Sequence, residues 1–185
     1  VALVTVSPLG NFVLTWEKLS ADAPQDPNLK VWDGNTGEYL YGVVQKVVKR
    51  EGWPYLKWTY DETYAFMMVT NEIRVYEGNA FQQKGDNVRF VDKMRIPGIS
   101  SFSVPVQASA DVPCLVTSFV PKSKDRPARM SLHKYPAAVV SPQAKSYPAL
   151  VSKSNNQVEE VDVHWSPKGD SALVSMQTSV DTSGE

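Results

Sequence analysis

The 185-residue sequence predicts an all-β protein, and three observations carry that prediction. No window of about eleven residues keeps the apolar spacing of an amphipathic helix. Short runs rich in β-branched and aromatic residues recur instead, and thirteen prolines and ten glycines separate them. Because no helical stretch could connect parallel neighbours, we expect the strands to pair antiparallel.

Fourteen strands are expected from these runs, each bounded by turn residues. The first two flank the turn Ser7-Pro-Leu-Gly, and the third ends at Asp33-Gly-Asn-Thr-Gly. Tyr60-Asp-Glu and Ser166-Pro-Lys-Gly-Asp separate later pairs in the same way. The expected strands are 3–6, 12–16, 29–32, 39–44, 55–58, 64–69, 72–76, 88–96, 99–104, 114–120, 129–135, 149–152, 161–165 and 172–177.

The order of strands and turns repeats along the chain. Positions 7, 59, 104 and 166 close equivalent first strands, at intervals of 52, 45 and 62 residues. In the first three units a third strand follows, such as Leu29-Lys-Val-Trp-Asp or Glu72-Ile-Arg-Val-Tyr-Glu, and then a fourth. Four strands per repeat of about 40–60 residues are typical of β-propeller blades, and Trp32-Asp33 is a WD-type dipeptide.

The sequence therefore predicts a WD40-like β-propeller. We expect residues 1–185 to form a partial propeller domain of about three and a half blades from a larger ring, because propellers typically have four or more blades. A β-sandwich also has many short strands, but it would not repeat this order. The approximate blades are 1–50, 51–97, 98–155 and an incomplete 156–185.

Composition narrows the function classes. The chain has 19 Lys+Arg against 20 Asp+Glu, which excludes a histone-like basic protein and an acidic disordered tail. No apolar run reaches the roughly 18 residues of a membrane span, and no targeting segment is recognisable. Cys114 is the only cysteine, so an intrachain disulfide is impossible. We expect a cytoplasmic protein with no membrane partner.

The residue types that carry catalysis are sparse. His133 and His164 are the only histidines, and neither has a metal-ligand spacing, so both are predicted to be ordinary strand residues. Cys114, in an apolar strand, is predicted to be a buried small hydrophobe. No nucleophile elbow, phosphate loop or dinucleotide motif occurs. The sequence thus predicts no catalytic residue, no metal site, no cofactor and no enzyme activity.

The paired carboxylates and the tryptophans have structural interpretations. The carboxylate pairs fall in predicted turns, where solvated caps explain Asp61-Glu62, Glu159-Glu160 and the Asp181/Glu185 pair. Trp32, Trp58 and Trp165 are predicted to occupy repeat-equivalent strand positions and to pack between blades. Trp16 and Trp53 are less constrained, and stacking on RNA bases is the alternative for them.

Basic residues form two clusters. One lies in Gln45-Lys-Val-Val-Lys-Arg, after a fourth strand, and the other lies within 121–135, where only Asp125 opposes five cations. Solvated loop charge is one interpretation, and a phosphate-contacting patch that attracts RNA in a salt-dependent way is the other. The candidate RNA- or ribosome-binding residues are Lys46, Lys49, Arg50, Lys122, Lys124, Arg126 and Arg129.

Several longer stretches resemble one known family. They include Leu29-Lys-Val-Trp-Asp-Gly-Asn-Thr-Gly-Glu, Lys57-Trp-Thr-Tyr-Asp-Glu, Thr70-Asn-Glu-Ile-Arg-Val-Tyr-Glu-Gly-Asn-Ala-Phe and Val163-His-Trp-Ser-Pro-Lys-Gly. In these stretches, and across nearly all of the chain, the sequence is similar to the eukaryotic translation initiation factor 2A family. The large propeller subunit of initiation factor 3 shares the Trp-Pro, Pro-Ala-Arg and Trp-x-x-x-Gly-Asp signals and is the nearest alternative.

The resemblance implies a nine-bladed propeller and a non-catalytic role in translation initiation. It implies association with the small (40S) ribosomal subunit and delivery of initiator methionyl-tRNA on selected mRNAs, alongside further initiation factors. A generic WD-repeat scaffold for protein–protein interaction is a second hypothesis. A third is a peptidase of the prolyl-oligopeptidase type, whose serine would lie outside these residues.

Overall fold

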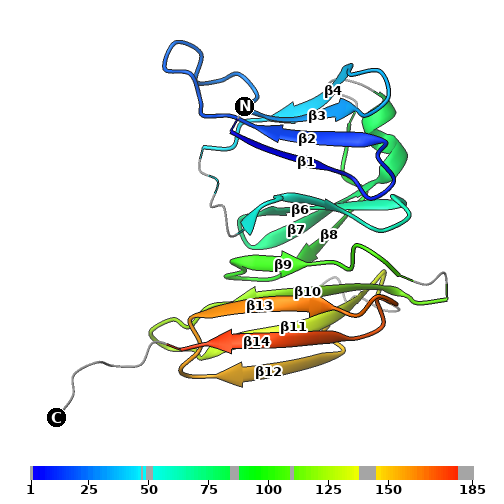
Figure 1. Cartoon of the computed structure of the whole chain (residues 1–185). Helices are drawn as coiled ribbons and strands as arrows, with labels where there is room; N and C mark the ends of the chain where they lie inside the picture. The colour runs from blue at the N-terminus through cyan, green and yellow to red at the C-terminus, as the bar shows by residue number, and fades with distance from the viewer. Residues whose placement is uncertain are drawn as a thin grey trace. The chain divides into compact units, whose positions relative to one another are not determined.

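The computed structural model describes residues 2–46, 48, 52–83, 88–108, 111–137 and 145–178. Within them, fourteen strands form three four-stranded sheets and one two-stranded sheet, and the described pairings are antiparallel (Figure 1). In each sheet the strands lie side by side in chain order, which is the meander of a propeller blade. The predicted all-β fold is therefore confirmed.

The chain forms two compact units, Val1–Met68 with Ile73–Lys93 and Val69–Glu72 with Met94–Glu185. The first sheet and most of the second belong to the first unit. Alternating buried and partly buried residues along these strands account for the sheets, because successive side chains point to opposite faces. The strands are β1 (Leu3–Val6), β2 (Phe12–Trp16), β3 (Leu29–Asp33) and β4 (Tyr39–Val43), then β5 (Leu56–Trp58), β6 (Tyr64–Val69), β7 (Glu72–Glu77) and β8 (Asp92–Arg95).

The second unit contains the third and fourth sheets. Its longest pairing joins β10 to β11 and runs in register from Cys114 opposite Tyr135 to Val120 opposite Arg129. No helix in the described ranges is long and apolar enough to cross a membrane. The strands are β9 (Ser101–Ser103), β10 (Cys114–Val120), β11 (Ala128–Tyr135), β12 (Val151–Asn155), β13 (Glu160–Trp165) and β14 (Ala172–Gln177).

A repeated turn joins the first two strands of three sheets. The Ser7 amide donates to the Phe12 carbonyl at 2.9 Å, and the Phe12 amide donates to Ser7 Oγ at 2.9 Å. Thr59 and Ser166 make the same pair of hydrogen bonds to the residue five positions later. The predicted equivalence of positions 7, 59 and 166 is therefore confirmed by hydrogen bonding.

The tryptophan equivalence was partly wrong. Trp58 and Trp165 are equivalent, because each ends the first strand of its sheet directly before Thr59 or Ser166. Trp32 lies instead on β3, a third strand, and its indole N–H donates to Thr15 Oγ1 of the same sheet at 2.8 Å. Sequence spacing could not separate these roles, because an apolar aromatic residue near a turn suits either strand.

Two expected strands are shorter than predicted by several residues, two others (39–44 and 55–58) by one residue each, and one helical turn was not predicted. The run 88–96 forms strand only over β8, and the run 99–104 only over β9, after a turn in which Gly98 has a φ of 81°. Between β7 and β8, η2 (Gly78–Gln83) is a 3-10 helix that places the fully buried Phe81 in the core of the first unit.

Candidate nucleic-acid interface

The structure brings four of the predicted basic residues together at one connection of the third sheet. Lys122, Lys124 and Arg126 lie between β10 and β11, and Arg129 is the second residue of β11. All four are exposed. We call residues 121–129 the basic hairpin. Lys46 follows β4, whereas the predicted Lys49 and Arg50 lie outside the described residues.

Backbone hydrogen bonds hold the basic hairpin in a defined shape. The Ser123 amide donates to the Arg126 carbonyl at 2.9 Å, and the Arg126 amide donates to the Ser123 carbonyl at 3.3 Å. The ladder between β10 and β11 continues directly below this pair, to Val120 opposite Arg129. The cations are therefore presented on a short, paired turn, which limits the conformational entropy that binding must remove.

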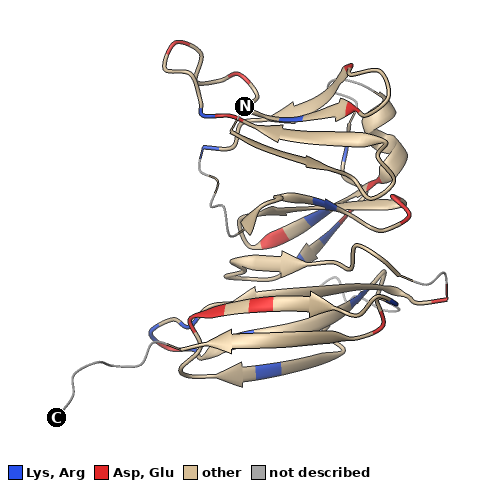
Figure 2. Ribbon diagram, viewed as in Figure 1, with Lys and Arg blue, Asp and Glu red and all other residues tan. Residues whose placement is uncertain are grey.

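A cleft of about 450 Å³ lies between the basic hairpin and the residues that precede β13. Its lining includes Val158, which is 2% exposed and belongs to the core of the second unit. Figure 2 shows basic segments at the β10–β11 connection and acidic segments on β13. The cleft is lined by Pro121, Lys122, Ser123, Lys124, Val158 and Glu159.

Glu159 changes the electrostatics that the sequence suggested. Counting along the chain, only Asp125 opposed the cations of this segment, but the fold places a second carboxylate beside Lys122 and Lys124. Among the described residues, neither lysine is paired with another side chain. The residues that line the cleft thus include two lysines, a serine and a glutamate. Glu159 is far from the two lysines in sequence and meets them only through the fold, so no sequence signal could have placed it in this cleft.

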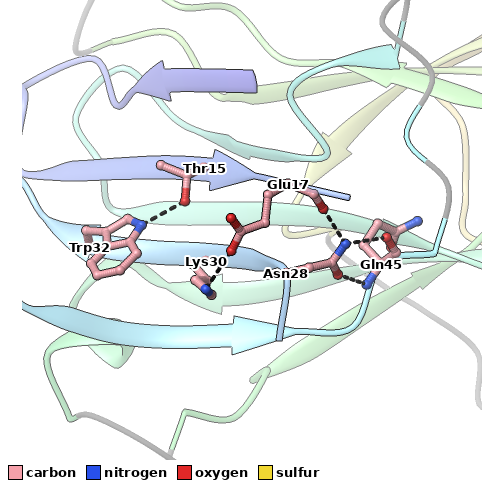
Figure 3. A network of polar contacts seen from close by, with 6 residues as sticks. All are labelled: Thr15, Glu17, Asn28, Lys30, Trp32 and Gln45. Atoms are coloured by element: carbon pink, nitrogen blue, oxygen red, sulfur yellow. Dashed lines mark hydrogen bonds and ion pairs between the residues drawn. The ribbon is translucent and has the colours of Figure 1, made fainter. Parts of the chain in front are cut away.

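The segment that carries Lys46 is fixed by a buried asparagine (Figure 3). Asn28 is 3% exposed, and its side-chain oxygen accepts the Gln45 amide at 2.7 Å. Its amide group donates to the carbonyls of Glu17, at 2.7 Å, and Gln45, at 3.0 Å. Trp16 Nε1 also donates to the Gln45 carbonyl, at 3.1 Å. The backbone immediately before Lys46 is therefore held by three hydrogen bonds.

One ion pair, between Lys30 and Glu17, lies near the segment that carries Lys46. Lys30 Nζ lies 2.8 Å from Glu17 Oε1, and this hydrogen bond lowers the pKa of Glu17 below its ordinary value. Both side chains are partly exposed, so the pair contributes little stability. Trp16 is half-buried and donates its indole N–H to the Gln45 carbonyl, and Trp53 is also half-buried, so neither side chain is fully exposed.

One surface pair of the first unit was missed. The Arg74 guanidinium lies 5.0 Å from the centroid of the Phe90 ring, and Phe90 is 42% exposed. Arg74 is on β7 and Phe90 precedes β8, so only strand pairing brings them together. On β5, burial lowers the pKa of the half-buried Lys57 to about 8. Neither feature had a recognisable motif.

The histidine prediction is confirmed, whereas the cysteine prediction was wrong. His133 is 2% exposed, Nε2 lies 2.9 Å from Ser118 Oγ, and Nδ1 lies 2.8 Å from the Pro148 carbonyl. Because a carbonyl only accepts, Nδ1 carries the proton and Nε2 accepts from the serine. This Ser–His pair is sealed inside the sheet and unavailable to a substrate. Cys114 is only half-buried, because it begins β10.

The carboxylate predictions divide. Asp61 caps its turn as predicted, since it accepts from the hydroxyls of Thr59 and Thr63 at 2.7 and 2.6 Å. Glu62 is not solvated: it is 6% exposed and accepts from the Leu9 amide and Asn11 Nδ2 at 2.8 and 2.9 Å. It links two sheets of the first unit, a role its turn position concealed.

The remaining acidic residues do not gather into a metal site. Glu159 and Glu160 are exposed, as predicted, but Glu160 begins β13 and does not lie in a turn, and Asp181 and Glu185 lie outside the described residues. In the described part of the chain, no group of three or more His, Cys, Asp and Glu side chains could hold a metal ion.

Sequence relatives share a common role by name. The chain is 30% identical over 186 residues to eukaryotic translation initiation factor 2A of Dictyostelium discoideum, covering 100% of this chain and 28% of that protein. It is 36% identical to the Schizosaccharomyces pombe protein of the same name, covering 97% and 28%. A component of eukaryotic translation initiation factor 3 from Xenopus laevis is 24% identical, covering 92% of the chain and 22% of that protein. No family model matches.

A solved structure supports the same relationship. A crystal structure of the eukaryotic initiation factor matches with a TM-score of 0.75 at 28% sequence identity, covering 95% of this chain and 41% of that one. The chain spans 28% of the length of the first two relatives. The chain is therefore, along nearly its whole length, a homologue of eukaryotic translation initiation factor 2A.

Proposed function

We propose that this chain is part of a non-catalytic translation initiation factor that associates with the small (40S) ribosomal subunit in the cytoplasm. In this proposal it supports delivery of initiator methionyl-tRNA, with mRNA and further initiation factors as partners. The observation that carries the proposal is the 30–36% identity to proteins named translation initiation factor 2A over nearly all of the chain.

The geometry supports a binding role rather than a chemical one. Propeller sheets form a stiff frame, and connections at their ends are free to contact partners. The basic hairpin presents Lys122, Lys124, Arg126 and Arg129 in one short segment, which suits the closely spaced phosphates of RNA. Lys46, with the adjacent Lys49 and Arg50, is the second proposed contact. We propose the blade boundaries 1–50, 51–97, 98–155 and 156–185, within a ring of nine.

Sedimentation with purified small ribosomal subunits tests the proposal. The full-length protein should co-sediment with these particles through a sucrose gradient, and less protein should do so as the salt concentration rises. Replacing the four basic-hairpin residues by alanine should reduce co-sedimentation and flatten its salt dependence. The matched control replaces Lys18, Lys93, Arg95 and Lys153 by alanine, which removes the same charge from exposed positions outside both basic clusters.

Each alternative predicts a different result. A folded protein that stays off the ribosomal particles even at low salt would favour the generic WD-repeat scaffold and end the ribosomal proposal. Stable incorporation into initiation factor 3 would favour the alternative to which the 24% identical relative points. Equal losses in the hairpin variant and its charge-matched control would remove the hairpin from the binding surface.

A further inference from the structure

The cleft beside the basic hairpin has a composition that general attraction to RNA does not require. Lys122 and Lys124 stand on the hairpin side, Glu159 comes from the segment before β13, and the partly exposed Pro121 adds apolar surface above the buried Val158. Its volume of about 450 Å³ falls within the range of sites that bind small molecules. A ligand that satisfies all of these groups carries an anion, an apolar face and a hydrogen-bond donor.

A nucleotide of single-stranded RNA has these three features. Its phosphate is an anion, its base has a flat face, and three of the four bases carry an exocyclic amino group. We propose that this cleft binds one nucleotide of a single-stranded RNA, with the phosphate at Lys122 and Lys124 and the base amino group at Glu159. The proposal rests on the proposed function, in which RNA contacts the basic hairpin.

The carboxylate of Glu159 gives the cleft a preference among bases. A glutamate accepts a hydrogen bond from the N4 amino group of cytosine. Uracil has the same ring but presents the O4 carbonyl at that position, and two acceptors face each other unfavourably. Because the two pyrimidines are equal in size, their comparison isolates this contact. The cleft should therefore prefer cytosine to uracil.

An acidic peptide fits the cleft less well. Its carboxylates could pair with Lys122 and Lys124, but an acidic side chain offers no hydrogen-bond donor to Glu159, which lines the same cleft, whereas a base amino group does. The lysines alone do not decide between phosphate and carboxylate. The presence of Glu159 in the same lining favours a ligand in which an anionic group is joined to a hydrogen-bond donor.

Binding of short fluorescent oligocytidylate and oligouridylate of equal length to the full-length protein tests the proposal by fluorescence anisotropy. Oligocytidylate should bind about 10-fold more tightly or better, as expected for one hydrogen bond to a charged acceptor. In Glu159→Gln the ratio should fall towards one, while the affinity for oligouridylate rises because a negative charge is gone. The control Glu160→Gln, at the exposed first residue of β13, should keep the wild-type ratio.

Lysine variants separate the phosphate contact from the base contact. Lys122→Ala with Lys124→Ala should weaken both oligonucleotides and lower the slope of log affinity against log salt by about two. Equal wild-type affinities for the two oligonucleotides, or a ratio unchanged in Glu159→Gln, would overturn the proposal. An oligoglutamate peptide that competes fully and binds more tightly to Glu159→Gln would identify the cleft as a peptide site instead.

The outcome is separable from that of the proposed function. If the wild-type protein co-sediments with small ribosomal subunits but shows no preference for oligocytidylate, the nucleotide site is refuted and the ribosomal role is not. A cytosine preference in a protein that does not bind the ribosome would support the site and refute the ribosomal role.

Discussion

The two contacts between neighbouring sheets, one in each compact unit, solve the same packing problem differently. In the first unit the contact is aromatic: Trp58 stacks on Phe12 with centroids 5.6 Å apart and an interplanar angle of 6°, and Phe81 packs against both. In the second unit it is built from Phe119, Met130 and smaller apolar residues that pack against partly buried valines. Equivalent positions in a repeated fold therefore need not share one chemistry.

The turn of the adjoining sheet differs in the same way. In the first unit Glu62 has a φ of 55° and its carboxylate reaches Leu9 and Asn11 of the neighbouring sheet. At the equivalent position of the second unit, Gly169 has a φ of 71°, and a Cβ there would lie 2.7 Å from the Gln107 carbonyl oxygen. In the first unit the Glu62 side chain connects the two neighbouring sheets, whereas in the second unit the backbone at Gly169 packs directly against the backbone at Gln107.

The largest expected effect compares the two equivalent tryptophans. Trp58 is 4% exposed and contacts two buried rings, so Trp58→Ala should lower the free energy of unfolding by about 3–5 kcal/mol. Trp165 is only half-buried, and its indole N–H donates to Ser103 Oγ at 2.9 Å. Trp165→Ala should lower it by about 1–2 kcal/mol. Chemical denaturation of the full-length protein measures both.

Equal losses of unfolding free energy in the two alanine variants would show that the two contacts stabilise their units equally, and the proposed difference between the units would then be wrong. Trp58→Phe is the matched control, because it keeps a ring against Phe12 and should lose much less than the alanine variant. If Trp58→Phe is as damaging as Trp58→Ala, size and stacking are not what stabilises the first unit.

The fold was more predictable than the contacts because the two depend on different distances along the chain. Alternating apolar residues and turn residues are local, so the strands at 3–6, 12–16, 64–69, 114–120 and 172–177 match the structure at both ends. Glu62 and Glu159 were misjudged or undervalued for the opposite reason. Glu62 accepts hydrogen bonds from another sheet, and Glu159 shares a cleft with a connection of another sheet. A carboxylate in a turn looks the same in sequence whether water or a neighbouring sheet surrounds it.

The candidate site also has one part that the sequence predicts and one part that it does not. The cations of the basic hairpin could be predicted, because Lys122, Lys124 and Arg126 are adjacent in sequence and a turn brings such residues together. The cleft could not, because its other wall comes from Val158 and Glu159. The pairing of Arg74 with Phe90 was missed for the same physical reason.

A smaller effect should distinguish two glycines with the same backbone conformation. Gly10 and Gly169 have φ values of 82° and 71°, but a Cβ at Gly10 would meet nothing within 4 Å. Gly10→Ala should therefore destabilise by about 1 kcal/mol, from backbone strain alone. Gly169→Ala should destabilise by about 2–3 kcal/mol, because the added carbon also meets Gln107 and Ala108. Thermal unfolding of both variants checks the difference, and equal shifts would show that the backbone does not close the second contact.

The smallest expected effect is a pH dependence confined to one sheet. Trp32 lies opposite Val13 and donates to Thr15, whereas His133 lies opposite Val116 and bonds to Ser118, so the two side chains occupy equivalent positions. Burial lowers the pKa of His133 from 6.5; the Pro148 carbonyl partly opposes this, and the Arg129 charge adds to it. The third sheet thus holds a titratable group where the first holds an indole.

The sign of the effect follows from proton binding. Below pH 6.5 this histidine is protonated in the unfolded chain, whereas the buried His133 of the folded protein stays neutral. The unfolded state therefore binds more protons, and the free energy of unfolding decreases as the pH is lowered. The slope should be at most about 1.4 kcal/mol per pH unit between pH 6.5 and about 5, above the range in which carboxylates with lowered pKa values, such as Asp61 and Asp170, protonate. His133→Gln should remove this slope, and His164→Gln, at the exposed histidine of β13, should leave it unchanged. A slope that survives His133→Gln in denaturant titrations at several pH values would assign the acid sensitivity to another group and remove this difference between the sheets.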